Sequence, residues 1–388
     1  YKKSLFTFDL KTVFYLIVGI TAFIIGYDFH FLKFSERNKI VEFFKREWDY
    51  KKSLRVLIIV SILNFSVKTI RVIYGGYSHI NKSYAFMSSQ FYSLIGLLDW
   101  LGPIALAIAF INYFRLFKEG DKNYLKWKWI ALFLFTFEFV YGFFSGSRFT
   151  AIIPIVLYLI VKHYLYKPDF RRVMIAFILI LFVLMPLQSF YRNPKILFRS
   201  YSAPVNNLVQ ITPTNIQQFI TDNSIGRINQ SRILSTLFEK TEKFLYGETL
   251  KNFFISLGPP RFIWRNKPVI SGGGNEFGRK IGILDSKDYT TSIGPTIIGD
   301  LYVNFGFTGI VLGMFLIGGI FRLIYELLIK NSNYSPFGVM AYSVVWIQLI
   351  KGMEDFIAPV WAGLVKLSVI MLIIHLALTW GKGKSQRL

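Results

Sequence analysis

The chain contains nine separate stretches of mostly apolar residues, each about as long as a lipid bilayer is thick. A helix needs about 20 such residues to cross the hydrocarbon core of a membrane. The stretches predict membrane-spanning helices over residues 12–32, 56–74, 91–114, 129–144, 149–166, 173–190, 305–329, 337–357 and 360–380. Hydrophobic residues make up 53% of the chain, which agrees with this class. We therefore expect an all-α polytopic membrane protein with about nine transmembrane helices.

Charged residues between the stretches predict how the chain threads through the membrane. The loops that begin at Arg37, Arg115, Lys167 and Lys330, and the tail from Gly381, are rich in lysine and arginine. Short loops with such a composition stay on the cytoplasmic side. The other loops, including the long polar stretch 191–291, are then expected outside. The same basic loops explain the formal net charge of +23 through anionic lipid headgroups, so nucleic acid is not an expected partner.

The polar stretch divides the chain into N-terminal transmembrane helices (1–190), an extracytoplasmic loop domain (191–291) and C-terminal transmembrane helices (292–388). Within the loop domain, Thr212-Pro213 predicts the start of one helix, and the spacing of apolar residues from Ile233 to Leu245 predicts a second, amphipathic one. From Gly258 onward, prolines and glycines predict an irregular arm. The domain has fourteen lysine and arginine residues against seven aspartate and glutamate, so an anion is the expected ligand.

A few ionisable residues fall inside the predicted spans. Lys68 lies near the end of the second span and is expected to extend its ammonium group to the membrane interface. Glu138 lies within the fourth span, and Lys351 precedes Glu354 and Asp355 at the end of the eighth. Ionisable groups at such a depth usually have a function. An ion pair between Lys351 and either carboxylate is an equally good structural interpretation.

Arginines are the main candidates for binding chemistry, because a guanidinium group is always charged and holds phosphate oxygens with two hydrogen bonds. The loop domain is rich in them, and Arg148 follows a hairpin on the same predicted side. There is no cysteine, and the four histidines have no metal-ligand spacing. We therefore expect no metal and no other cofactor.

Three groups of residues resemble the Wzy-type oligosaccharide repeat-unit polymerases, which are O-antigen polymerase-like membrane glycosyltransferases. The most distinctive is Pro260-Arg261-Phe262-Ile263-Trp264-Arg265-Asn266-Lys267-Pro268, similar to Pro-Arg-x-x-Trp-Pro-x-Lys-Pro in the family, with Arg265 in place of a proline. The second is Gly299-Asp300-Leu301-Tyr302-Val303-Asn304-Phe305-Gly306-Phe307-Thr308-Gly309, similar to Gly-Glu-x-Tyr-x-Asn-Phe-Gly-x-x-Gly, with aspartate in place of glutamate. Shorter matches are Gly146-Ser147-Arg148, Tyr191-Arg192 and Tyr246-Gly247.

The resemblance implies a C-type glycosyltransferase architecture and an active site that faces the outside or periplasm. Such an enzyme transfers a glycan from a polyprenyl-diphosphate-linked oligosaccharide to a lipid-linked acceptor sugar, without a metal. Membrane lipids and a chain-length regulator protein are the further partners that it implies. The expected location is the inner or plasma membrane.

Site residues follow from these motifs and from the chemistry of the reaction. A carboxylate is needed to accept the proton of the acceptor hydroxyl, and arginines are needed to stabilise the leaving diphosphate. The candidate bases are Asp300, Glu276 and Glu354. The candidate diphosphate ligands are Arg148, Arg192, Arg261, Arg265, Arg279, Arg227 and Arg232. The aromatic residues expected to stack on sugars are Trp264, Tyr289 and Tyr302.

Three other functions remain open from the sequence. A glycan ligase would use the same donor and a different acceptor. A flippase or exporter of lipid-linked glycan should have internal repeats and charges that line a path through the membrane, and neither is evident here. A structural partner of an assembly complex would not need so many outer arginines.

Overall fold

The computed structural model describes residues 9–29, 38–74, 92–168, 170–192, 231–259, 263–268, 274–280, 282, 284–287 and 293–379, with the backbone alone at 92, 93, 189, 190, 192, 231, 232 and 280. Its elements are α1 (Leu10–Asp28), α2 (Lys39–Phe44), α3 (Tyr50–Ile73), α5 (Tyr92–Leu98), α6 (Leu101–Glu119), α7 (Tyr124–Phe144), α8 (Arg148–Leu165), α9 (Phe170–Leu179), η1 (Ile180–Leu184), α10 (Met185–Arg192), α13 (Ser231–Lys240), α14 (Glu248–Leu257), α15 (Gly274–Lys280), α16 (Thr296–Tyr325), η2 (Glu326–Lys330), α17 (Pro336–Gly352) and α18 (Ile357–Thr379). In the described part of the chain every regular element is a helix, which confirms the predicted all-α class.

Eight of the described helical segments are long and apolar enough to cross a membrane. They confirm a polytopic membrane protein and correspond to eight of the nine predicted spans. The remaining predicted span, 337–357, is the shorter helix α17, which has 17 residues and a length of about 26 Å. All but four of these 17 residues are buried, because α17 lies inside the bundle and contacts α6, α8 and α18.

Burial of the helices shows which of them form the centre of the bundle. α6 is buried over most of its length, and it packs against α3, α7, α8 and α17. In contrast, α9 has no buried residue, so its apolar side chains are available to lipid.

Glycines allow α1 and α16 to pack closely against each other. A Cβ atom added to Gly26 would lie 2.0 Å from the carbonyl oxygen of Phe315, and one added to Gly318 would lie 2.1 Å from that of Phe23.

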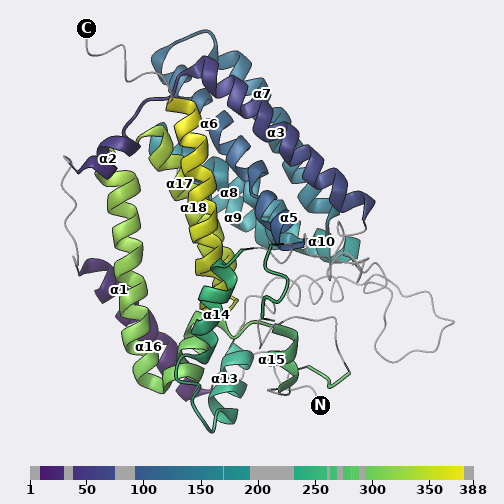
Figure 1. Ribbon diagram of the computed structural model, residues 1–388, viewed down its shortest axis with the longest axis vertical. Coiled ribbons are helices and arrows are strands. Elements are labelled where there is room, and N and C mark those ends of the chain that lie inside the picture. Colours follow the sequence, from purple (N-terminus) through teal and green to yellow (C-terminus); the bar gives the residue numbers. More distant parts are fainter. Residues whose placement is uncertain are drawn as a thin grey trace, which may run out of the picture.

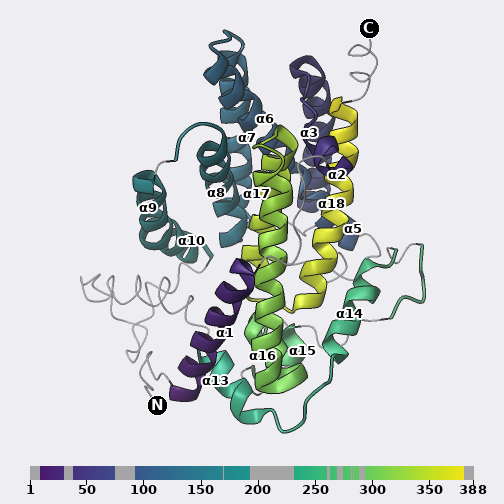
Figure 2. The same ribbon diagram turned by 90° about the vertical axis from the view of Figure 1, so that its left-hand side faces the viewer.

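The two ends of the bundle differ in composition. Lys45, Arg115 and Lys330 come from three of the predicted cytoplasmic loops, and they line one polar cavity at the end that carries α2. The described helices of the loop domain, α13, α14 and α15, lie toward the opposite end (Figures 1 and 2). This separation is the one that the predicted threading requires.

Lys68 does not extend to the membrane interface, so that prediction is wrong. Its side chain is buried between α3 and α7 and forms an ion pair with Glu138. Asn64, one turn earlier on α3, donates a hydrogen bond of 2.8 Å to the same carboxylate. Glu138 lies 70 residues away in the sequence, so the pairing is not evident from the local pattern. A buried ammonium group is stabilised more by a carboxylate in contact than by extending its side chain to the membrane interface.

The loop domain is more helical than its sequence pattern predicts. The predicted helix over 233–245 ends at Lys240, and two unpredicted helices follow, α14 and α15. The predicted span 305–329 also begins earlier than expected. Helix α16 begins at Thr296 and continues through a kink at Gly306, where φ is 63° and ψ is −150°. Thr212-Pro213 lies outside the described residues.

Candidate functional site

The segment Gly299–Gly309, the second of the polymerase-like motifs, lies near the start of α16, and the Asp300 side chain is enclosed within it. The side chain is fully buried and accepts three hydrogen bonds. Thr249 Oγ1 of α14 donates to Oδ1 at 2.7 Å, Asn304 Nδ2 donates to Oδ1 at 3.1 Å, and the backbone N–H of Ile357 donates to Oδ2 at 2.9 Å. Asp300 therefore joins α14, α16 and the first residue of α18. Because its carboxylate accepts hydrogen bonds from three segments, Asp300 has a structural role.

Asn304 attaches the segment before α14 to the same turn of α16. The kink at Gly306 releases backbone carbonyls of α16 from their usual partners. The N–H of Leu245 donates to the Val303 carbonyl at 2.9 Å, and the N–H of Tyr246 donates to the Asn304 carbonyl at 3.0 Å. The Asn304 side-chain oxygen accepts from the N–H of Gly247 at 3.0 Å. The Tyr246-Gly247 pair thus lies directly against the Gly299–Gly309 segment.

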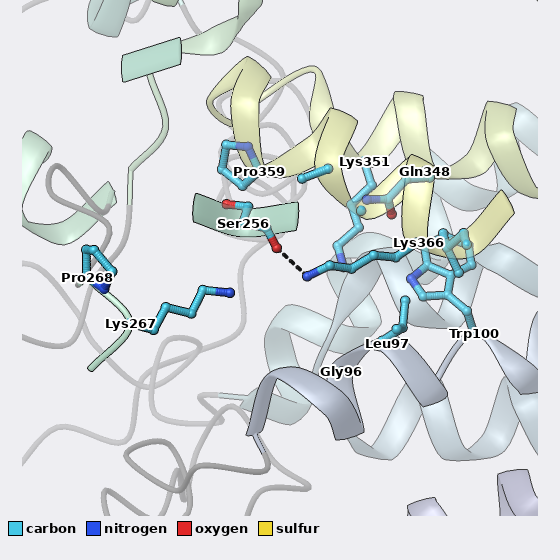
Figure 3. Close-up of a pocket in the computed structure, with 13 residues that line it drawn as sticks. Gly96, Leu97, Trp100, Ser256, Lys267, Pro268, Gln348, Lys351, Pro359 and Lys366 are labelled. Atoms are coloured by element: carbon cyan, nitrogen blue, oxygen red, sulfur yellow. Dashed lines mark hydrogen bonds between the residues drawn. The ribbon is translucent and has the colours of Figure 1, made fainter. Parts of the chain in front are cut away.

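These contacts place α14 alongside α18 and enclose a cavity of about 340 Å³ (Figure 3). It lies among α5, the start of α6, α14, α17 and α18, and the arm that follows α14 closes one side. The lining residues are Gly96, Leu97, Trp100, Ser256, Lys267, Pro268, Gln348, Lys351, Pro359, Ala362, Gly363, Lys366 and Leu367. Three of these residues are lysines and none is acidic, so the described walls carry a positive charge.

Each lysine approaches the cavity from a different element. Lys267 of the arm donates from Nζ to the carbonyls of Gly258 at 3.0 Å and Pro259 at 3.2 Å. Lys366 of α18 donates to the carbonyl of Ser256 near the end of α14. An ammonium group has three N–H donors, so the Lys366 contact leaves donors for an anion in the cavity. Figure 3 shows Lys267 on one side and Trp100 and Gln348 on the other, with Lys351 and Lys366 extending between them.

Lys351 has no salt bridge within the described part of the chain. The alternative of an ion pair with Glu354 or Asp355 is therefore not realised there, although Asp355 lies close enough for its charge to interact with Lys351. Enclosure by the protein raises the pKa of the Asp355 carboxyl, and the Lys351 ammonium opposes this shift. Asp99, the other nearby carboxylate, is held by Arg71 at 2.6 Å. Lys351 thus lines the cavity without a salt bridge in the described residues, although the charges of Asp355 and Asp99 both act on it.

Of the predicted site residues that the structure describes, none lines this cavity. Arg148 begins α8, and the end of α10 packs against the same hairpin: the Tyr191 ring lies 5.9 Å from that of Phe143, and Gln188 donates to the Phe143 carbonyl at 3.2 Å. The backbone of Arg192 is therefore near the Arg148 hairpin. Arg232 is described only as backbone in α13, and Arg227, Arg261 and Tyr289 lie outside the described residues.

The remaining predicted residues have varied surroundings. Glu276 is exposed and Arg279 is half-buried, both on α15, which contacts the α17–α18 connection through rings of Phe277 and Phe356 that are 5.4 Å apart. Glu354 is exposed in that connection, three residues after Lys351. Arg265 and Trp264 are exposed on the arm next to Lys267.

Tyr302 differs from a sugar-stacking residue in its environment. It is buried, and its ring packs at 4.5 Å from Phe238 and 5.7 Å from Tyr15. This burial favours a packing role, and the predicted sugar contact stays a prediction.

Sequence reasoning missed Lys366, Ser256 and Gln348, and treated Lys351 only as a pairing partner. The available signal was polarity within an apolar span: Lys366 and Gln348 each interrupt a long hydrophobic run. The sequence alone favours the arginines of the loop domain, because a planar guanidinium group matches the geometry of a phosphate better than an ammonium group does.

Replacing Asp300 by asparagine should destabilise the protein by about 2–3 kcal/mol, because an amide cannot accept all the donors that now meet the carboxylate. Thermal unfolding in detergent is the measurement. Asp285→Asn is the matched control, since Asp285 is exposed and accepts one local hydrogen bond, from Lys287 N at 2.9 Å. Equal unfolding temperatures for both variants would contradict the structural role.

The fold and the cavity define a class: a multi-pass helical membrane protein with a cationic cavity at the end that carries its polar loop domain. A family model described as "Putative O-antigen polymerase" matches residues 277–359. This segment contains Gly299–Gly309, Gln348, Lys351 and Pro359. The match confirms the resemblance predicted from the motifs and supports assignment to the Wzy-type O-antigen polymerase family, whose members are polymerising enzymes of the glycosyltransferase type. No curated protein and no solved structure has a significant match to the chain.

Proposed function

We propose that this protein polymerises lipid-linked oligosaccharide repeat units on the outer face of the membrane. It transfers a glycan from a polyprenyl-diphosphate carrier to the sugar of a second lipid-linked unit. The cavity is the observation that carries this proposal. It combines Lys267 and Pro268, from one polymerase-like motif, with Gln348, Lys351 and Pro359, from the segment matched by the family model, and its described walls are cationic.

The three lysines complement the donor's leaving group. In the reaction, the bond between the anomeric carbon and the diphosphate oxygen breaks, and the diphosphate keeps the electron pair. Lys267, Lys351 and Lys366 stabilise the negative charge that develops, because all three line the cavity in which we place the diphosphate. The acceptor hydroxyl then forms the new bond to the anomeric carbon and gives its proton to a carboxylate.

Glu354 is our candidate for that base, because it is exposed and follows Lys351 by three residues on the same connection. Glu276 on α15 is the second candidate, since α15 contacts this connection through Phe277 and Phe356. We assign Asp300 a positioning role: its carboxylate holds the N–H of Ile357 and so fixes the start of α18, which carries Lys366.

The arginines of the loop domain extend the positive surface beyond the cavity. Arg265 and Arg261 belong to the arm that carries Lys267, and Arg148 and Arg192 lie at a second junction on the same half of the molecule. We assign Arg148, Arg192, Arg227, Arg232, Arg261, Arg265 and Arg279 to attraction and orientation of the anionic donor. Trp264 is exposed beside Lys267 and is suited to stack on a sugar face, as is Tyr289 by its place in the arm.

An in vitro reaction tests the proposal. The full chain, purified in detergent, is incubated with a polyprenyl-diphosphate-linked repeat unit, and the products are separated by size. A ladder of products at intervals of one repeat is the expected result. A single transfer to a different acceptor would instead indicate a ligase. Translocation of the lipid in vesicles without any new glycosidic bond would indicate a flippase. Addition of a chain-length regulator protein should narrow the ladder if that partner acts on this enzyme.

A further inference from the structure

Two residues that line the cavity each hold a polar side-chain atom that no protein group satisfies in the described part of the chain. Gln348 Oε1 and Ser256 Oγ are both buried and have no hydrogen-bond partner there. The two residues come from α17 and α14, with Lys351 and Lys366 between them (Figure 3). Buried polar atoms are rarely left without a partner, and in a membrane protein the cost of doing so is high. An unmet acceptor and an unmet hydroxyl at one cavity indicate a ligand that supplies hydrogen-bonding groups.

The surroundings of Gln348 leave space for its amide to reach the cavity. Gly363 of α18 faces it, and a Cβ atom added to Gly363 would lie 3.1 Å from Gln348 Nε2. Any side chain at position 363 would therefore press on the amide. Trp100 lies beside Gln348 on the same side of the cavity and adds an aromatic surface (Figure 3). The cavity thus brings together amide, hydroxyl and aromatic groups, which is the combination that recognises a carbohydrate.

The position of Gln348 relative to the lysines identifies which part of a donor it meets. Gln348 and Lys351 are three residues apart on α17, so their side chains are neighbours on one helix face. A phosphate group held by Lys351 brings the sugar attached to it next to Gln348. Gln348 thus offers a neutral polar group directly beside a cationic one.

We infer that Gln348 and Ser256 recognise the sugar that is bonded directly to the diphosphate, and that they make the site selective for that sugar. This inference rests on the proposed function, because it takes the cationic part of the cavity as the diphosphate site. Gln348 accepts a hydrogen bond from a hydroxyl or an acetamido N–H of the sugar. The Ser256 hydroxyl bonds a second group of the same ring, while the Ser256 carbonyl stays with Lys366.

Binding of two probes tests the inference: a polyprenyl diphosphate that carries the oligosaccharide, and the same polyprenyl diphosphate without sugar. Gln348→Leu should weaken binding of the glycan-bearing lipid about tenfold and leave binding of the bare lipid unchanged, because one neutral hydrogen bond is lost. Ser256→Ala should act in the same direction and keeps the backbone bond to Lys366, so it replaces the first variant if Gln348→Leu does not fold.

Gln188→Leu is the matched control. Gln188 is the same residue type, is buried, and bonds the backbone of the α7–α8 hairpin at a distance from the cavity. It should lower stability without changing the ratio of the two affinities. Suppose that the wild type forms product ladders. The inference is then overturned if Gln348→Leu weakens binding of both probes equally, or if neither cavity variant changes the ratio of the affinities for the two probes. If the wild type binds neither probe and forms no ladder, the proposed function itself fails and the inference with it.

Discussion

Replacing Lys351 by methionine is expected to weaken binding of a polyprenyl diphosphate by at least about tenfold and to reduce polymer formation to a similar extent. A hydrogen bond to a charged group contributes about 1.5–3 kcal/mol, and each 1.4 kcal/mol is a factor of ten in affinity. Methionine keeps the length and apolar character of the lysine stem, so the cavity should retain its shape.

Lys351 is the best of the three lysines for this test. It has no salt bridge to lose within the described residues, whereas Lys366→Met also breaks the contact with the Ser256 carbonyl and so loosens α14 from α18. Lys366→Arg preserves the charge and a carbonyl contact, and should retain part of the binding. Calorimetry or a fluorescent lipid diphosphate provides the dissociation constant.

The control for this experiment is Lys251→Met. Lys251 lies on α14, toward the same end of the molecule, and its side chain is exposed and does not line the cavity. Removing its charge should change affinity less than about threefold, since a charge that does not line the cavity acts on the ligand only from a distance and is screened by salt. Equal losses for Lys251→Met and Lys351→Met would mean that only the general positive field matters. Normal affinity in Lys351→Met would remove the cavity from the mechanism.

The sequence predicted the fold well wherever the signal was local. An apolar run of sufficient length has one stable solution in a membrane, and therefore eight of the nine expected spans appear as long apolar helices. The loop helices α14 and α15 were missed because their stability depends on tertiary contacts. Asp300 and Asn304 position α14, and Phe277 of α15 packs on Phe356, far away in the sequence.

The site was less predictable than the fold for the same reason. The cavity is assembled from α5, α6, α14, α17, α18 and the arm, and no single stretch contains more than a few of its residues. Lys366 alone resembles a membrane anchor, and Gln348 alone resembles a tolerated polar residue in a span. Only the folded structure shows that Lys366 and Gln348 line the same cavity as Lys267 and Lys351. The motif Pro260–Pro268 belongs to the arm that borders this cavity, and its residues that line the cavity are Lys267 and Pro268, not its arginines.

The second large effect is expected at the buried pair of Lys68 and Glu138. Replacing Glu138 by leucine should reduce the free energy of unfolding by about 3–5 kcal/mol, because it leaves an unpaired ammonium group inside the bundle. The rings of Tyr141 and Phe137, with centroids 4.4 and 5.0 Å from Lys68 Nζ, offset only part of this cost. Thermal unfolding and detergent resistance of the purified protein measure the loss.

The double variant Lys68→Met, Glu138→Leu separates the pair's contribution from that of its individual charges. Removing both charges together removes the uncompensated ion, so stability should return to within about 1 kcal/mol of the wild type. Asn64 then loses its contact with the Glu138 carboxylate, which accounts for the remaining difference. The exposed pair of Arg115 and Glu47 is the control: Glu47→Ala should cost less than about 1 kcal/mol.

A double variant as unstable as Glu138→Leu would show that the pair is needed for packing in a way that apolar side chains cannot replace. A double variant with full stability but no polymer ladder would give the pair a role in the reaction. The pair belongs to a charged group that continues through Arg71 and Asp99 toward the cavity, since Arg71 Nη2 lies 3.9 Å from the position of a Cβ atom on Gly96. We expect the double variant to be stable and to form normal ladders. Lys68 and Glu138 would then serve only to hold α3 against α7, and the proposed binding of the diphosphate would depend on the three cavity lysines.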